Sequence, residues 1–265
     1  MRIKGLSKGS PAVKLFWFFA SLALLSGGAA LLAQIYAHEL FGWTSTVHRE
    51  RREVTPAERV NISSADIPLE VFTYDGEKII VEYIGESALV IAEDESGLRI
   101  FREEDFTLSL FSTDILNYAM TVWLPKQTYK EVRLTTASGD INAENISAEF
   151  ISVTSRTGNI DLYDIEGLAS ISTRYGDVKV EFVNFTDICV IDTETGKTEV
   201  IMPTRFPVRL DFLTDTGSFT SDFFRREYDG HQGDLYLVTG VNPVRITVRT
   251  GSGSLYFCTR DESVG

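Results

Sequence analysis

The chain has 265 residues, of which 43% are hydrophobic, so it is long enough for one substantial core with appendages. Its formal net charge is −13, and because the first 37 residues hold four bases and no acid, the remainder carries −17. A domain this acidic repels DNA, RNA and anionic wall polymers, so we expect no nucleic-acid partner and favour cationic partners, divalent ions or simple solubility.

The N-terminal segment has the pattern of a membrane anchor. Residues 1–14 are basic, and residues 15–37 form an uncharged run. At about 1.5 Å per residue this run is long enough for a bilayer core of ~30 Å. The pattern predicts a single-pass transmembrane helix with a cytoplasmic N-terminus and the bulk of the chain extracytoplasmic. The alternative is a signal peptide cleaved near Gly28, but the apolar run continues beyond that site.

Strand patterns follow a polar segment of mixed charge, residues 38–56, which we interpret as a stalk. Alternating apolar residues begin at Val60, and the turn signal Asp75-Gly76 separates two of the runs. We expect an extracytoplasmic β domain over 57–258. Its less regular portion, 60–131, is the expected N-terminal cap, because a solenoid needs atypical end units to protect its sheet edges.

One short pattern recurs through residues 132–258. Its cores are SGDI, TGNI, YGDV, TGKT and TGSF, and a sixth copy, SGSL, follows about two steps later. The steps between the first five glycines are 19, 18, 20 and 21 residues, and the turn glycines are Gly139, Gly158, Gly176, Gly196, Gly217 and Gly253. A fixed period of this kind indicates stacked repeats.

Aligning the copies on their glycines reveals alternation with period two on both sides. Val153, Ile171 and Ile191 share one apolar position, and a hydroxyl residue stands three before every glycine. This predicts strand, tight turn, strand, with the glycine providing a positive φ. We expect an all-β solenoid with coils of about 19 residues, each adding roughly 4.8 Å. A β-sandwich of antiparallel hairpins is the alternative.

The outward carboxylates of the repeats are separated by other residue types. Asn159 stands between Asp140 and Asp177, and Lys179 stands between Asp161 and Glu199. Like charges one rung apart would repel by about 1 kcal/mol. We interpret this spacing as a structural ladder. The alternative is an acid cluster on a groove, as in glycan-cleaving β-helices, with Asp161, Asp177 and Glu199 as its acids.

The segments TTASGDI, SRTGNIDL and TRYGDVKV, preceded by LPK and by NISSADIPLEV, resemble a known family. The chain is similar to the bacterial "putative adhesin" β-strand-repeat proteins over roughly residues 57–258. The resemblance implies a membrane-anchored protein of the cell envelope with no established activity. It also hints at envelope-stress signalling, and it brings no catalytic or ligand-binding residues. Lys197 and Thr198 depart from the family pattern, and residues 222–243 break the period.

A Gly-containing loop at 223–236 is the least periodic part of the C-terminal half. It is either an insertion between coils or an exposed binding loop. As a binding loop its candidate interaction residues are Arg225, Arg226, Tyr228, His231 and Tyr236. Residues 259–265 form the expected tail.

The sequence offers few candidate catalytic or metal-binding groups. It has three histidines, no P-loop and no Ca²⁺-loop pattern. Cys189 is expected to be a buried hydrophobe, about three rungs or 14 Å from Cys258 and thus too far for a disulfide. We therefore expect no enzyme activity, no cofactor and no metal.

These observations predict a membrane-anchored adhesion, binding or scaffold module whose ligand is an unidentified protein or glycan. The alternatives are a carbohydrate-active β-helix enzyme and an accessory of envelope-stress signalling.

Overall fold

The structure, a computed structural model, describes residues 47–102, 118–184, 188–203, 207–224 and 231–260. The chain divides into two compact units, Met1–Thr46 and Val47–Gly265, and every described residue belongs to the second. The predicted transmembrane segment 15–37 therefore lies outside the described residues. In the part of the chain that is described, no helix is long and apolar enough to cross a membrane.

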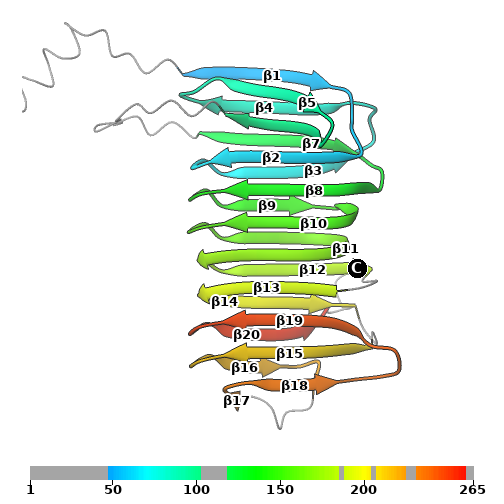
Figure 1. Ribbon diagram of the computed structural model, residues 1–265, viewed down its shortest axis with the longest axis vertical. Coiled ribbons are helices and arrows are strands. Elements are labelled where there is room, and N and C mark those ends of the chain that lie inside the picture. Colours follow the sequence, from blue (N-terminus) through cyan, green and yellow to red (C-terminus); the bar gives the residue numbers. More distant parts are fainter. Residues whose placement is uncertain (1–46, 103–117, 185–187, 204–206, 225–230, 261–265) are drawn as a thin grey trace, which may run out of the picture. The chain divides into compact units, whose positions relative to one another are not determined.

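The described residues form strands that stack into two sheets (Figure 1). In spatial order the first sheet consists of β1 (His48–Val54), β4 (Ile79–Gly85), β7 (Ala119–Pro125), β3 (Leu69–Tyr74), β9 (Ile141–Glu144), the first half of β11 (Ile160–Tyr175), β12 (Val178–Asn184), β14 (Lys197–Met202), β20 (Ser254–Thr259), β16 (Ser218–Ser221) and β17 (His231–Gln232).

The second sheet contains the remaining strands and shares β11 with the first. In spatial order it consists of β5 (Leu89–Asp94), β6 (Gly97–Arg102), β2 (Arg59–Ala65), β8 (Tyr129–Thr136), β10 (Ser147–Ser155), the second half of β11, β13 (Ile188–Thr195), β19 (Val244–Thr250), β15 (Val208–Thr214) and β18 (Leu235–Val238).

Each regular coil crosses from the second sheet to the first at a glycine corner. β8 leads to β9, β10 to β11 and β13 to β14, and each strand pairs in parallel with the equivalent strand of the next coil. The all-β solenoid is confirmed. The hairpin sandwich is wrong, because the two arms of a repeat lie in different sheets and do not pair with each other.

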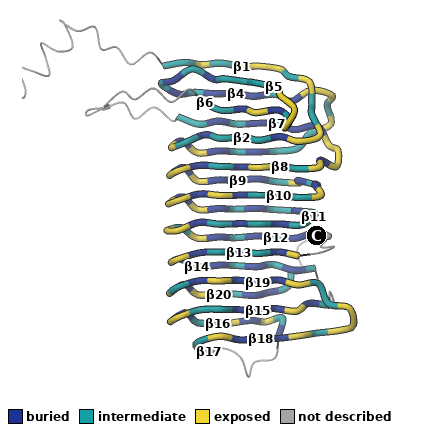
Figure 2. Tube along the Cα trace, viewed as in Figure 1, coloured by how far each residue is buried: buried dark blue, intermediate teal, exposed yellow. Residues whose placement is uncertain are grey.

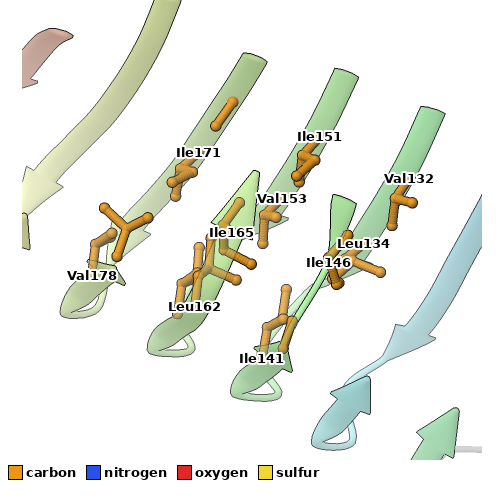
Figure 3. Packing of buried hydrophobic residues seen from close by; sticks show 14 of the residues in the cluster. Val132, Leu134, Ile141, Ile146, Ile151, Val153, Leu162, Ile165, Ile171 and Val178 are labelled. Carbon is orange, nitrogen blue, oxygen red and sulfur yellow. The ribbon is translucent and has the colours of Figure 1, made fainter. Parts of the chain in front are cut away.

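The core fills the space between the two sheets. Val153 pairs with Ile171 and Ile171 with Ile191, and all three are fully buried. In Figure 3, Leu134, Val153 and Ile171 occupy the same position on successive strands and point inward with Leu162 and Val178. Figure 2 shows the buried positions on every coil. The apolar rows predicted from the alternation are therefore the core.

The corner glycines are required by close packing. A Cβ on Gly158 would lie 2.0 Å from the carbonyl oxygen of Gly139, and one on Gly176 would lie 2.3 Å from that of Gly158. Of the six corner glycines only Gly196 has a positive φ. The predicted reason, a left-handed turn, is thus wrong for the other five, because the limiting factor is the backbone of the adjacent coil.

Side chains beside the glycines tie neighbouring coils together. The buried hydroxyl of Ser155 accepts a hydrogen bond from the backbone N–H of Gly158 at 2.9 Å, within its own turn. Across coils, Asp140 Oδ1 accepts from the N–H of Asn159 at 2.7 Å, and Asn159 Oδ1 accepts from that of Asp177 at 2.9 Å. Asp and Asn after the glycine therefore satisfy backbone donors of the next coil, a role that charge spacing alone did not indicate.

The coils at both ends are not stacked in chain order. The sixth repeat copy, in β19 and β20, lies between β13/β14 and β15/β16, so Gly253 packs between Gly196 and Gly217. The order of the copies in the stack thus differs from their order in the sequence. At the other end, β2/β3 lies between β6/β7 and β8/β9. The local sequence pattern does not distinguish this coil order from stacking in chain order, because every copy has the same inward positions.

The inserted coil also changes the relation between the cysteines. Cys189 on β13 and Cys258 on β20 belong to adjacent coils, so the predicted three-rung separation is wrong. Both thiols are nevertheless unpaired and buried. Burial raises the pKa of Cys258 to about 12 and that of Cys189 higher still, so neither thiol is a reactive thiolate at neutral pH.

Reversed strands cap the stack. β4 and β5 run antiparallel to β7 and β6, and β17 and β18 run antiparallel to β16 and β15. Beyond β4 lies β1, with the sequence HRERREV, so the solenoid begins inside the predicted stalk 38–56 rather than at residue 57. Its charged side chains suit an outermost strand, because they discourage pairing with other chains.

Candidate functional site

The outer faces of the two sheets differ in chemistry. In the central coils the first sheet presents mostly charged residues and their polar neighbours: Asn142, Glu144, Asp161, Tyr163, Lys179, Glu181 and Glu199. The second sheet presents, on β10, β11 and β13, mainly small hydroxyl and apolar side chains. In a chain with 24% charged residues, a nearly uncharged strip is the unusual surface.

An apolar row runs across the second sheet. Phe150 on β10 pairs with Leu168 on β11, and Ile188 stands in the same position on β13. Phe150 and Leu168 are half-buried, and Ile188 is 40% exposed. Charged residues end the row, with Glu131 on β8 at one side and Arg245 on β19 at the other.

Two polar rows run parallel to the apolar row. The middle row is Arg133, Ser152, Ser170, Val190 and Thr247. The hydroxyl row is Ser63, Thr135, Thr154 and Ser172, and it continues in register with Asp192 and Arg249. We call the three rows together the outer strip. Short side chains on parallel strands leave its surface flat.

An open groove of about 630 Å³ follows the hydroxyl row at the glycine corners. Arg156, Arg174 and Glu194 stand along it, and Arg174 pairs with Glu194 at 2.9 Å. Farther along, Arg249 pairs with Asp192 at 3.1 Å. Among the described residues no ion pair is formed by Arg156, so the groove offers one uncommitted guanidinium beside a row of hydroxyls.

A buried carboxylate lies near the C-terminal end of the same face. Asp211 on β15 is 2% exposed and accepts hydrogen bonds from Arg245 at 2.8 Å and Arg209 at 3.1 Å. Burial acts to raise the pKa of Asp211, but the hydrogen bonds and positive charges of the two arginines outweigh it, so the pKa lies below its ordinary value. The carboxylate therefore links β15 to β19 in its ionised form.

Replacing Asp211 by asparagine is expected to destabilise the fold by about 1–3 kcal/mol at pH 7, because the two arginines lose their shared acceptor. The folded-state pKa is depressed, so the stabilisation is present above the unfolded pKa and is lost as pH falls through the folded pKa. Urea unfolding at neutral and acidic pH should therefore show a gap between wild type and variant that narrows in acid. Asp215→Asn, in an exposed turn of the same repeat, is the control; a pH-independent gap for Asp211→Asn would contradict the assignment.

The three acids of the alternative glycan-cleaving site lie beside cationic or backbone groups. Asp161 pairs in register with Lys179, Asp177 Oδ1 accepts the backbone N–H of Lys197, and Glu199 pairs with the Lys197 ammonium at 2.9 Å. Burial raises the pKa of Asp161, neighbouring carboxylates add to the rise, and Lys179 opposes it. No group of His, Cys, Asp and Glu in the described ranges could hold a metal ion.

The interaction residues predicted from the sequence are only partly described. Arg225, Arg226 and Tyr228 lie outside the described residues, and only the backbone of His231, at the start of β17, is described. Tyr236, on β18, is 62% exposed and pairs in register with Asp211. It thus lies on the outer face of the second sheet, in line with the middle row.

The outer strip itself was missed by the sequence analysis. Its apolar row occupies the position eight before each glycine, which is Phe150, Leu168 and Ile188 in the second to fourth copies. This position has outward parity, and three consecutive apolar residues at an outward position were the available signal.

Parallel coils, reversed ends and two chemically distinct faces define a capped β-solenoid repeat protein. The chain belongs to the Toastrack DUF4097 family, whose sequence profile matches residues 104–256. No curated protein sequence matches the chain.

Solved structures are similar to this chain. A "putative cell adhesion protein" from Clostridium sporogenes is 13% identical with a TM-score of 0.52, covering 81% of this chain and 100% of that one. A "putative adhesin" from Bacteroides fragilis is 8% identical with a TM-score of 0.36, covering 80% of this chain and 97% of that one. The resemblance to the "putative adhesin" proteins is thus confirmed.

Proposed function

We propose that the protein is a non-catalytic adhesion or scaffold module, anchored in the cell membrane through residues 15–37 and binding its partner through the outer strip. The observation that carries the proposal is the difference between the two outer faces. A charged face such as that of the first sheet is solvated at little cost. On β10, β11 and β13 the strip has one charge to desolvate, the Asp192 carboxylate that pairs with Arg249, and several apolar and hydroxyl groups to contribute on contact.

The proposed anchoring rests on the sequence of the N-terminal segment. Its 23 uncharged residues suit a bilayer, and the basic residues before them favour a cytoplasmic N-terminus. The solenoid would then stand on the outer side of the membrane, where a flat sheet face is accessible to other envelope components.

The proposed lack of catalysis is supported by the contacts of the carboxylates. Asp177 accepts a backbone N–H of the adjacent coil, Glu199 pairs with Lys197 of its own strand, and Asp161 stands in register with Lys179 of the adjacent coil. A glycan-cleaving pair needs one proton-donating acid and one free carboxylate, on two sides of the scissile bond. The carbohydrate-active enzyme remains the second candidate, with the groove along the hydroxyl row as the place for a glycan.

The test expresses the full chain in bacterial cells. We expect protease added to intact cells to digest the solenoid, and cells carrying the protein to adhere to one another or to envelope material. Ser170→Arg, in the middle of the outer strip, should abolish adhesion, whereas Ile201→Lys, on the outer face of the first sheet, should retain it. Equal adhesion by the two variants, or protection of the solenoid in intact cells, would contradict the proposal. Release of reducing ends from cell-wall glycans by the purified full chain would support the enzyme instead.

A further inference from the structure

We infer that the partner of the outer strip is a second copy of this chain. The two copies pack face to face with their solenoid axes antiparallel. The inference rests on the proposed function and names its partner. It follows from the distribution of charged and apolar side chains along the three rows, which is complementary to itself in one orientation and not in the other.

The antiparallel orientation is generated by a two-fold axis that runs along the strands through Leu168. It places Leu168 of one copy against Leu168 of the other and exchanges β10 with β13, so Phe150 faces Ile188. One strand farther out it exchanges β8 with β19, so Glu131 faces Arg245. Apolar residues therefore meet apolar residues, and unlike charges meet at both sides.

The two polar rows fit the same axis. In the middle row Ser170 faces Ser170, and Arg133 faces the neutral Thr247. In the hydroxyl row Ser172 faces Ser172, and the charged Asp192 and Arg249 face the neutral Thr154 and Thr135. Like charges meet at the margins of the contact. Glu166 and Arg174 lie on the axis beyond the three rows, where Arg174 is paired with Glu194 of its own copy at 2.9 Å. Three strands from the axis Arg59 on β2 faces Arg209 on β15.

The parallel orientation, in which the two solenoid axes point the same way, is unfavourable. Its two-fold axis would run along the middle row, so Arg133 would face Arg133. The apolar row would face the hydroxyl row, so Arg245 would face Arg249. Ile188 would lie against Asp192. Like charges and an apolar residue against a carboxylate would disfavour this arrangement at the centre of the contact.

The strip has the size that a specific pair requires. Seven strands, from β2 to β15, at about 4.8 Å each and about seven residues at 3.3 Å each make a footprint of roughly 800 Å² per copy. Specific protein interfaces bury about 800 Å² on each partner. The apolar residues lie on the three central strands of this footprint, and charged residues such as Glu131 and Arg245 flank them on the next strands.

The antiparallel direction has a consequence for adhesion. The chain enters the solenoid at β1, at the end opposite to β17 and β18. An antiparallel pair therefore has its two β1 strands at opposite ends. This suits copies that belong to two facing surfaces, and homophilic contact between them would join the surfaces.

The test measures self-association of the purified full chain in a mild non-ionic detergent by sedimentation velocity over a wide concentration range. We expect a dimer. Leu168→Glu and Leu168→Lys should each weaken it by roughly 30-fold or more, because like charges face each other on the axis. The matched control Ile201→Lys, a half-buried position on the outer face of the first sheet, should leave the dimer intact.

Mixing the two Leu168 variants decides the orientation. In the antiparallel pair Glu faces Lys, so the mixture should recover dimers that neither variant forms alone. A monomeric wild type, dimers unaffected by both substitutions, or a mixture without recovery would overturn the inference. If adhesion to envelope material in the cell assay persists with a monomeric chain, the proposed function survives and only the choice of partner fails.

Discussion

Replacing Gly158 by alanine is expected to destabilise the solenoid by about 3 kcal/mol or more, which is a large part of the 5–15 kcal/mol available to a typical domain. The added Cβ would lie 2.0 Å from the carbonyl oxygen of Gly139 and 2.9 Å from Ser155 Oγ. Neither neighbour is free to move, because Gly139 belongs to the adjacent corner and Ser155 holds the Gly158 N–H. Relief therefore requires separation of two coils.

The measurement is chemical unfolding followed by circular dichroism. Thr157→Ala, at the exposed neighbouring position of the same turn, is the control and should change the free energy of unfolding by at most about 0.5 kcal/mol. A Gly158→Ala protein as stable as the control would show that the corners can separate without cost, and close glycine packing would then not explain the repeat.

Truncation after Pro243 is expected to have an even larger effect, because it removes β19 and β20 from the interior of the stack. The lost coil contributes the buried residues Ile246, Val248, Leu255 and Phe257, at about 1.5–3 kcal/mol each. It also exposes the coils on both of its sides, β13/β14 and β15/β16. The total is comparable with the stability of the whole domain.

Amide hydrogen exchange is the appropriate measurement. We expect β13, β14, β15 and β16 to lose protection together, although none of them is deleted. Truncation after Arg260 keeps every described strand and is the control. Retained protection in β15 and β16 would mean that this coil had moved into the vacant place, and the inserted order would then not be required for stability.

Local features of the fold were predictable from single copies of the repeat. Period-two alternation assigns Val153 and Ile171 to the core, and a hydroxyl three before each glycine marks the corner, because both depend on neighbours within a few residues. The same reasoning could have reached Phe150, Leu168 and Ile188 as an outward apolar row. It could not assign them a partner, because the charges that flank the row come from β8 and β19, which are far apart in the chain.

The sequence by itself determined the all-β solenoid, its coil length, its inward rows and its family resemblance, since these follow from the repeated short-range pattern. Only the tertiary structure decided the order of the coils, the reason for the glycines and the chemistry of each outer face. The physical cause is that strand pairing depends on which edges meet in space. Each copy has the same inward residues, so a coil such as β19/β20 can be inserted between two others and still continue every row.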